Sequence, residues 1–212
     1  MRVGAYIKFL YNSVNEHGVH SPFVFGLVTK GFYRKQPLIT DVNYNPVAGL
    51  NSTTLNILFK VIAHFKSYKL IVLGEDDVAT AVAETMRQAA EEINTKIWFY
   101  STYVAVPGGV DLAILTGKDR ATLLPLMQQL KSDINNDSIA VIANIHESDA
   151  IEQAWESIKK DPDVTVSIDA YHLGVLFFRK EQQKQHFVIR PSKSKITDAV
   201  LGIRTLWGLL LR

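Results

Sequence analysis

The chain has 212 residues, 47% of them apolar, and a net charge of +2, so it can form one sizeable hydrophobic core, and we expect one α/β domain with a helical extension. It contains no cysteine, which excludes disulfides, thiolate metal sites and cysteine nucleophiles and is compatible with the cytoplasm. The apolar runs are shorter than the roughly 20 residues of a membrane-spanning helix. Polar residues interrupt the apolar positions of the first 18 residues, which predicts an amphipathic helix rather than a signal peptide.

Charge is distributed unevenly along the chain. Residues 1–40 carry a net charge of +4 and residues 179–212 carry +6, which leaves −8 for the middle. The simplest interpretation is a solvated surface that keeps the protein soluble. The alternative is an anionic partner for the two basic ends, such as a membrane surface, a nucleic acid or the acidic body of another copy.

Residues 1–51 are predicted to form an N-terminal helical extension. Apolar positions from Val3 to Val14 recur at helical spacing, and Gly18 is placed to end that helix as a left-handed cap. Ser21 as N-cap and Pro22 as first helical residue predict a second helix that reaches about Lys30. Two histidines flank the corner between the helices, but no carboxylate neighbour completes a metal site, so we expect no metal there.

Strands and helices alternate through residues 52–190. A helix capped by Ser52 or Thr53 precedes the apolar strand "KLIVLG", and the strands "KIWFYS", "VDLAILTG" and "SIAVIANI" follow, with helices after the first, third and fourth strands. We expect Pro125 in the first turn of one helix and Asp149 as the N-cap of the next. "VTVSIDAYHLGVLFFR" predicts an antiparallel hairpin at the sheet edge. This order predicts a doubly wound, mostly parallel sheet that binds any ligand at the carboxyl ends of its strands.

The C-terminal residues 191–212 are predicted to form an amphipathic helix, because the apolar residues of "ITDAVLGIRTLWGLLLR" gather on one helical face. The favoured interpretation is a helix that docks on the domain or on another copy. The alternative is a basic helix that lies in a membrane interface, with Trp207 near the headgroups.

Residues 69–82 are predicted to form a strand, a glycine loop and a helix, and they are followed by "VDLAILTG", "SIAVIANIHESDAIEQAWESI" and a terminal hairpin. This order resembles that of the class I S-adenosylmethionine-dependent methyltransferases. "HGVHSPFVF" and residues 145–190 resemble a bacterial subgroup with the same N-terminal helical extension. The resemblance implies a Rossmann-like fold and, if the protein is active, S-adenosylmethionine as its cofactor. The residues in position to hold that cofactor are Gly74, Glu75, Ser101 and Asn144.

The expected cofactor site departs from the family pattern. Gly74 is the one glycine of its loop, and the acids from Glu75 to Asp77 suit a helix N-terminus but would repel the carboxylate of S-adenosylmethionine. "KIWFYS" lacks the acid that the family uses to bind the ribose. Only about ten residues separate it from "VDLAILTG", too few for a crossover helix, so we expect the sheet to be reduced by one strand and its helices.

Catalytic residues are weakly indicated. Metal-assisted members of the family carry acids after the two central strands, because a hard divalent cation needs several oxygen ligands. The matching positions of this chain are not occupied by acids. His146, Asp119 or Glu147 could act as a general base at a strand's carboxyl end, but a role in a surface loop is the favoured interpretation for each.

We therefore expect a divergent methyltransferase-like protein that lacks cofactor binding and catalysis and acts through a protein partner or as a homo-oligomer. The first alternative is an active methyltransferase on a small molecule, with a pocket remodelled around Gly74, Ser101 and Asn144. The second is a peripheral membrane protein held by its basic terminal helices. Nucleic acid is not expected as a partner, because no basic stretch is interleaved with aromatic residues in a recognisable module.

Overall fold

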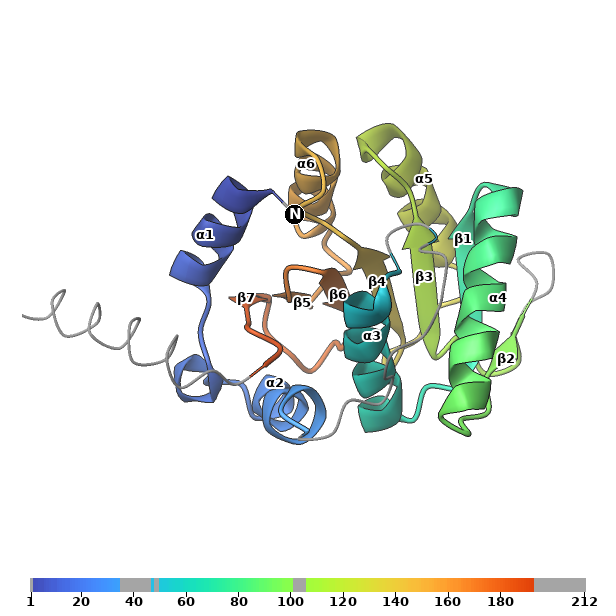
Figure 1. Cartoon of the computed structure of the whole chain (residues 1–212), viewed down its shortest axis with the longest axis horizontal. Helices are drawn as coiled ribbons and strands as arrows, with labels where there is room; N and C mark the ends of the chain where they lie inside the picture. Colours follow the sequence, from blue (N-terminus) through green and yellow to red (C-terminus); the bar gives the residue numbers. More distant parts are fainter. Residues whose placement is uncertain (1, 35–46, 48–49, 101–105, 193–212) are drawn as a thin grey trace, which may run out of the picture.

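The computed structural model describes residues 2–34, 47, 50–100 and 106–192. Its centre is a seven-stranded sheet in the order β2-β1-β3-β4-β6-β5-β7 (Figure 1). The strands are β1 (Lys69–Gly74), β2 (Trp98–Phe99), β3 (Leu112–Thr116), β4 (Ile139–Ala143), β5 (Val166–Asp169), β6 (Leu173–Phe177) and β7 (Gln185–Val188).

Eight helical segments accompany the sheet in the described residues. They are α1 (Val3–Asn12), the 3₁₀-helix η1 (Glu16–Gly18), α2 (Pro22–Gly26), the π-helix η2 (Leu27–Phe32), α3 (Ser52–Phe65), α4 (Asp76–Glu92), α5 (Arg120–Leu130) and α6 (Asp149–Ile158). No helix in the described part of the chain has the length and apolar character to cross a membrane.

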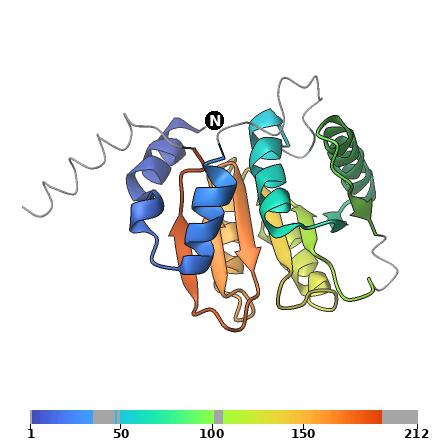
Figure 2. The same ribbon diagram turned by 90° about the horizontal axis from the view of Figure 1, so that it is seen from below.

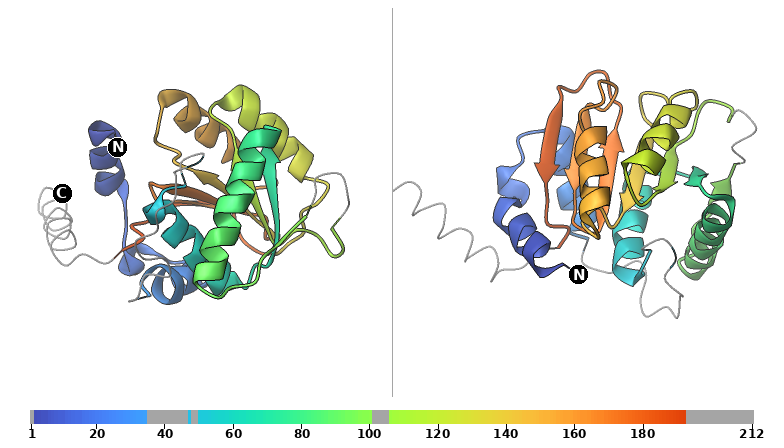
Figure 3. Two further views of the ribbon diagram at one scale, coloured as in Figure 1. Left: turned by 45° about the vertical axis from the view of Figure 1, so that its right-hand side comes forward. Right: turned by 90° about the horizontal axis from the view of Figure 1, so that it is seen from above.

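The strand directions confirm the predicted sheet. β2, β1, β3 and β4 run parallel, β6 lies antiparallel between β4 and β5, and β7 pairs parallel with β5. Helices α2, α3 and α4 cover one face (Figure 2), and α5 and α6 cover the other (Figure 3). The chain therefore has a Rossmann-like, doubly wound fold with an antiparallel C-terminal hairpin.

The apolar strands supply two hydrophobic cores, one on each face. In β1, Leu70 and Val72 point into the core beneath α3 and α4, whereas Ile71 and Leu73 point into the core beneath α5 and α6. Because successive side chains of a strand point to opposite faces, a parallel strand covered on both sides must be apolar throughout. This explains why "KLIVLG", "VDLAILTG" and "SIAVIANI" could be recognised from the sequence.

The two edges of the sheet differ from each other. At one edge, β2 is the last strand, and the described residues between β2 and β3 contain no helix or strand, as the short connection predicts. At the other edge, the expectation that the hairpin would be outermost is wrong, because β7 lies outside β5. Gln185 donates from its backbone N–H to the Thr165 carbonyl and Ile189 to the Asp169 carbonyl, both at 2.8 Å, so β7 satisfies the outer backbone groups of β5.

The N-terminal extension packs into the core beneath α2 and α3. Val24, Leu27, Val28 and Phe32 are buried there with α3, and Ser21 caps α2 as predicted by accepting the Val24 N–H at 3.4 Å. The prediction that Gly18 ends the first helix is wrong. Helix α1 ends at Asn12 because Val14 adopts an extended conformation and donates its N–H to the Val188 carbonyl at 2.8 Å, which joins the extension to β7.

Two further predicted helix caps are corrected. Asn51, rather than Ser52 or Thr53, caps α3 by accepting the Thr54 N–H at 3.0 Å. Ser148, rather than Asp149, caps α6 by accepting the Ile151 N–H at 3.3 Å. Adjacent polar residues can compete for the same cap, and the sequence pattern does not rank them.

Pro125 lies in the second turn of α5 rather than in its first. The helix begins earlier than predicted because Asp119 and Thr122 form a capping box, in which Asp119 accepts the Thr122 N–H at 2.9 Å and Thr122 Oγ1 accepts the Asp119 N–H at 3.3 Å. The predicted helix at residues 191–212 lies almost entirely outside the described residues. The domain limits 1–51, 52–190 and 191–212 remain predictions.

Candidate functional site

The end of β1 is the first candidate site, because the cofactor loop of the resemblance falls there. Gly74 has φ +156°, and a Cβ added to it would lie 1.7 Å from Thr116 Oγ1 and 2.9 Å from the Thr116 carbonyl oxygen. Thr116 belongs to the neighbouring strand β3, and its Oγ1 donates to the Leu73 carbonyl at 3.0 Å. The sheet itself therefore requires glycine at this position, since Thr116 occupies the space that the missing side chain leaves.

The three acids after Gly74 begin α4. Glu75 is the N-cap residue but makes no capping hydrogen bond with its side chain, and Asp76 and Asp77 lie in the first turn. All three are exposed. Carboxylates in this position interact favourably with the helix dipole, so the acids stabilise the start of α4 without any ligand.

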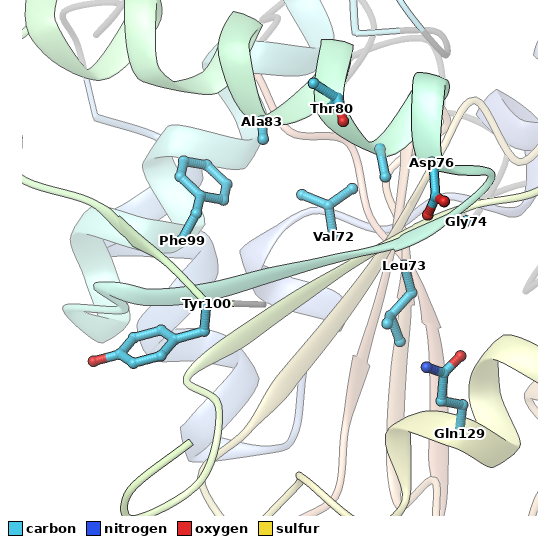
Figure 4. A pocket seen from close by; sticks show the side chains of 10 residues that line it. Val72, Leu73, Gly74, Asp76, Thr80, Ala83, Phe99, Tyr100 and Gln129 are labelled. Atoms are coloured by element: carbon cyan, nitrogen blue, oxygen red, sulfur yellow. The ribbon is translucent and has the colours of Figure 1, made fainter. Parts of the chain in front are cut away.

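A pocket of about 390 Å³ opens beside Gly74, at the edge of β1 that β2 leaves uncovered. Thr80, Ala83 and Phe99 border it on the α4 side, whereas Tyr100 and Gln129 border it on the other side (Figure 4). The remaining lining residues are Val72, Leu73, Gly74, Asp76 and Ala79. The lining combines apolar and aromatic side chains with the polar side chains of Asp76, Thr80 and Gln129. It contains no Lys or Arg, so it disfavours a phosphate.

Three of the four predicted cofactor residues lie in the described part of the chain. Gly74 lines the pocket, and Glu75 and Asn144 do not. Asn144 follows β4 with φ +50° and donates its backbone N–H to the His172 carbonyl at 2.8 Å, which is the conformation of a turn. Ser101 lies outside the described residues.

A second candidate site surrounds His146, at the carboxyl ends of β4 and β5. His146 Nε2 lies 2.8 Å from Asp169 Oδ2, and Nδ1 lies 3.8 Å from Glu152 Oε1, an ion-pair contact longer than a hydrogen bond. The imidazole stacks on Tyr171 at 5.2 Å between ring centroids. Asp169 also accepts the Tyr171 N–H at 2.8 Å.

The protonation of His146 follows from these contacts. Burial by itself lowers its pKa, but the hydrogen bond and charge of Asp169, with a further contribution from Glu152, outweigh burial and raise the pKa above its usual value. Both ring nitrogens face carboxylates, which favours the imidazolium. His146 is thus held in place by a hydrogen bond to Asp169 that is strengthened by charge.

Helix α1 covers this second site. Arg2 forms ion pairs with Asp149 and with Glu152, the latter at 3.5 Å, and Tyr171 donates its hydroxyl to the Arg2 carbonyl at 3.3 Å. Tyr6 and Phe9 place their rings 4.9 and 5.3 Å from the ring of Tyr171. The His146 pair therefore lies beneath α1 and helps to hold that helix on the domain.

The other two general-base candidates have separate surroundings. Asp119 belongs to the capping box of α5, and the hydrogen bonds from the Thr122 backbone and hydroxyl lower its pKa. Glu147 is exposed. No hydrogen bond or ion pair in the described residues joins either of them to His146, and the described part of the chain has no cluster of three His, Cys, Asp or Glu that could hold a metal.

The sequence reasoning missed Asp169, Glu152 and Tyr171 as neighbours of His146. The available signal was positional, because His146 and Asp169 each follow a strand whose carboxyl end lies at the same edge of the sheet. It could not show which of the polar residues at that edge would meet.

Comparisons with known proteins assign no family to the chain. No protein-family model matches the sequence, and no curated protein matches it. Among solved structures, the chain is similar to the SAH-bound Podospora anserina methyltransferase PaMTH1, with a TM-score of 0.40 and 10% identity over 84% of this chain and 94% of that chain. The fold assignment above stands on the strand order and on the helices that cover both faces.

Proposed function

We propose that this chain is a methyltransferase-like α/β protein that does not bind S-adenosylmethionine, does not catalyse, and acts by binding a protein, which is another copy of itself in the simplest case. The observation that carries the proposal is the contact between Gly74 and Thr116. A glycine in a cofactor loop allows a ligand to approach the backbone, whereas here the position is glycine because β3 lies against it.

The pocket chemistry supports the same proposal. The Asp76 carboxylate lies at the Gly74 end of the pocket (Figure 4), and no cation in the lining could pair with the carboxylate of S-adenosylmethionine. A carboxylate near another carboxylate is disfavoured. The lining thus offers no partner for the carboxylate of this cofactor, which supports the proposed absence of binding.

An exposed apolar face supports the binding half of the proposal. Val3, Ile7 and Tyr11 follow one another at helical spacing along α1 and are 65%, 61% and 57% exposed. Contiguous apolar side chains on the surface are typical of protein-binding faces. Sedimentation velocity over a range of concentrations tests for self-association, with Ile7→Lys expected to weaken it and Trp98→Lys, at another exposed apolar residue, as the control. Equal behaviour of the two variants would refute this role for α1.

Isothermal titration calorimetry with S-adenosylmethionine and S-adenosylhomocysteine tests the cofactor half directly. We expect no binding heat for either up to millimolar concentration. Adenosine is the matched probe, because it lacks the amino-acid carboxylate. Binding of adenosine alone would mean that the pocket accepts the base and the acids reject the rest.

The alternative function is an active methyltransferase that acts on a small molecule, and the pocket beside Gly74 is the observation in its favour. A pocket with Phe99 and Tyr100 at a strand's carboxyl end could stack a purine. Saturable heat with S-adenosylmethionine, abolished in a Thr80→Trp variant that fills the pocket, would establish this alternative and overturn the proposal.

A further inference from the structure

Four basic side chains gather where η2 packs against α3. A Cβ added to Gly31 would lie 3.5 Å from the His64 Cβ, and Lys60 Nζ donates to the Phe32 carbonyl at 2.8 Å. Figure 2 shows the two helical segments side by side. We call the four side chains the basic cluster: Lys30, Arg34, Lys60 and His64.

The cluster consists of two pairs, each with a spacing of four residues. Lys30 and Arg34 are exposed, whereas Lys60 and His64 are half-buried. Gly31 and Phe32 thus lie against His64 and Lys60, and the charges of Lys30 and Arg34 act on His64 and Lys60, respectively. Basic groups from two separate elements thus share one small area of surface.

Within the part of the chain that the structure describes, ion pairs do not balance the positive charge of the cluster. Within the described residues, no carboxylate lies within ion-pair distance of any of the four. Burial lowers the pKa of Lys60 and the Arg34 charge lowers it further. Burial likewise lowers the pKa of His64, and the Lys30 charge adds to the effect.

Helix capping explains only part of this arrangement. Lys60 satisfies the Phe32 carbonyl at the end of η2, and a basic residue near a helix C-terminus interacts favourably with the dipole. Lys60 and His64 are four residues apart on α3, a spacing at which like charges repel each other, and Lys30 and Arg34 add further positive charge from the end of η2 and the residues after it. The Lys60 ammonium uses one of its three N–H donors for Phe32, which leaves two for a ligand.

We propose that the basic cluster is a binding site for a phosphate-bearing anion with at least two negative charges. Ammonium and guanidinium groups form charge-assisted hydrogen bonds with phosphate oxygens, and a multivalent anion would relieve the repulsion between the two pairs. The ligand source is either a free oligophosphate or a phosphorylated lipid headgroup. The proposal is independent of the proposed function, because the cluster shares no residue with the pocket beside Gly74.

The test uses the full chain and the imidazole of His64 as a reporter. The His64 resonance is assigned as the one that His64→Asn removes, and its pKa is followed by NMR with increasing sodium tripolyphosphate. A bound anion favours the imidazolium. We therefore expect a saturable change with a rise in the pKa of His64.

Paired variants separate the site from general attraction by a basic protein. Lys30→Gln/Arg34→Gln removes two exposed cluster members and is expected to weaken tripolyphosphate binding at least about tenfold. Lys118→Gln/Arg120→Gln removes two exposed basic residues at the start of α5 and should leave the affinity unchanged. An equal loss in both variants would overturn the proposal.

A vesicle arm distinguishes the two sources. Binding to phosphatidic acid vesicles but not to phosphatidylcholine vesicles, lost in Lys30→Gln/Arg34→Gln, would identify a lipid headgroup as the ligand. Binding to tripolyphosphate without vesicle binding would identify a soluble anion. Absence of both, with an unchanged His64 resonance at millimolar tripolyphosphate, would overturn the proposal.

Discussion

The two halves of the sheet differ, because one is extended and covered by added elements and the other is reduced. On the β4–β7 side, the hairpin is extended by β7, joined to Val14 and covered by α1. On the β1–β2 side, β2 has two residues, and the connection to β3 contains no helix or strand in its described residues. The side that would bind a cofactor is the reduced one, and this contrast is what the proposed loss of cofactor binding predicts.

The largest expected effect lies in the extended half. Trp155 of α6 is fully buried, and Gly174 of β6 lies against its ring, since an added Cβ would be 2.7 Å from Trp155 Cζ3. Trp155→Ala should lower the free energy of unfolding by roughly 3 to 5 kcal/mol because it leaves a large cavity. Urea denaturation measures this, and a loss of under about 1 kcal/mol would show that this packing contributes little.

The reduced half is tested by Gly74→Ala. The added methyl group would collide with Thr116 at an unfavourable φ, so we expect a loss of roughly 2 to 5 kcal/mol in the free energy of unfolding. Gly4→Ala in α1 is the control, because nothing lies within 4 Å of its Cβ position, and it should change stability by about 1 kcal/mol or less. Similar stability of the two variants would contradict a structural role for Gly74.

The attachment of α1 is tested through His146. His146→Gln should lower the free energy of unfolding at pH 6 by roughly 1.5 to 3 kcal/mol, since it removes a charged hydrogen bond to Asp169. The pKa of His146 is raised in the folded state, so its contribution is fully present below the unfolded pKa and is lost as the pH rises through the folded pKa. The difference in free energy of unfolding between wild type and His146→Gln should therefore shrink as the pH rises above 6.5. A difference that stays constant up to pH 9 would refute the charged pair.

The smallest effect concerns the loop candidates for catalysis. Asp119→Ala should lower the midpoint of thermal unfolding, because it removes the cap of α5. Glu147→Ala, at an exposed residue, is the control and should be within about 0.5 kcal/mol of wild type. Thermal unfolding compares the two, and a larger loss in Glu147→Ala would overturn both assignments.

The sequence predicted the sheet because its strands are buried on both faces and are therefore apolar throughout. It predicted that no crossover helix follows β2, because too few residues separate β2 from β3 to form one. It did not predict that β7 would be the edge strand, since both edges offer similar backbone groups. The Gly74–Thr116 and His146–Asp169 contacts depend on strand register and loop conformation, which residue types alone do not specify.

Hydrogen exchange measured with and without millimolar S-adenosylhomocysteine tests the central claim most directly, because it reports on both halves at once. The account predicts that amides of β4, β5 and β6 exchange most slowly and that the ligand changes no amide between Gly74 and Ala79. Slower exchange at those amides when S-adenosylhomocysteine is present would show that the acidic loop holds a cofactor and would contradict the account.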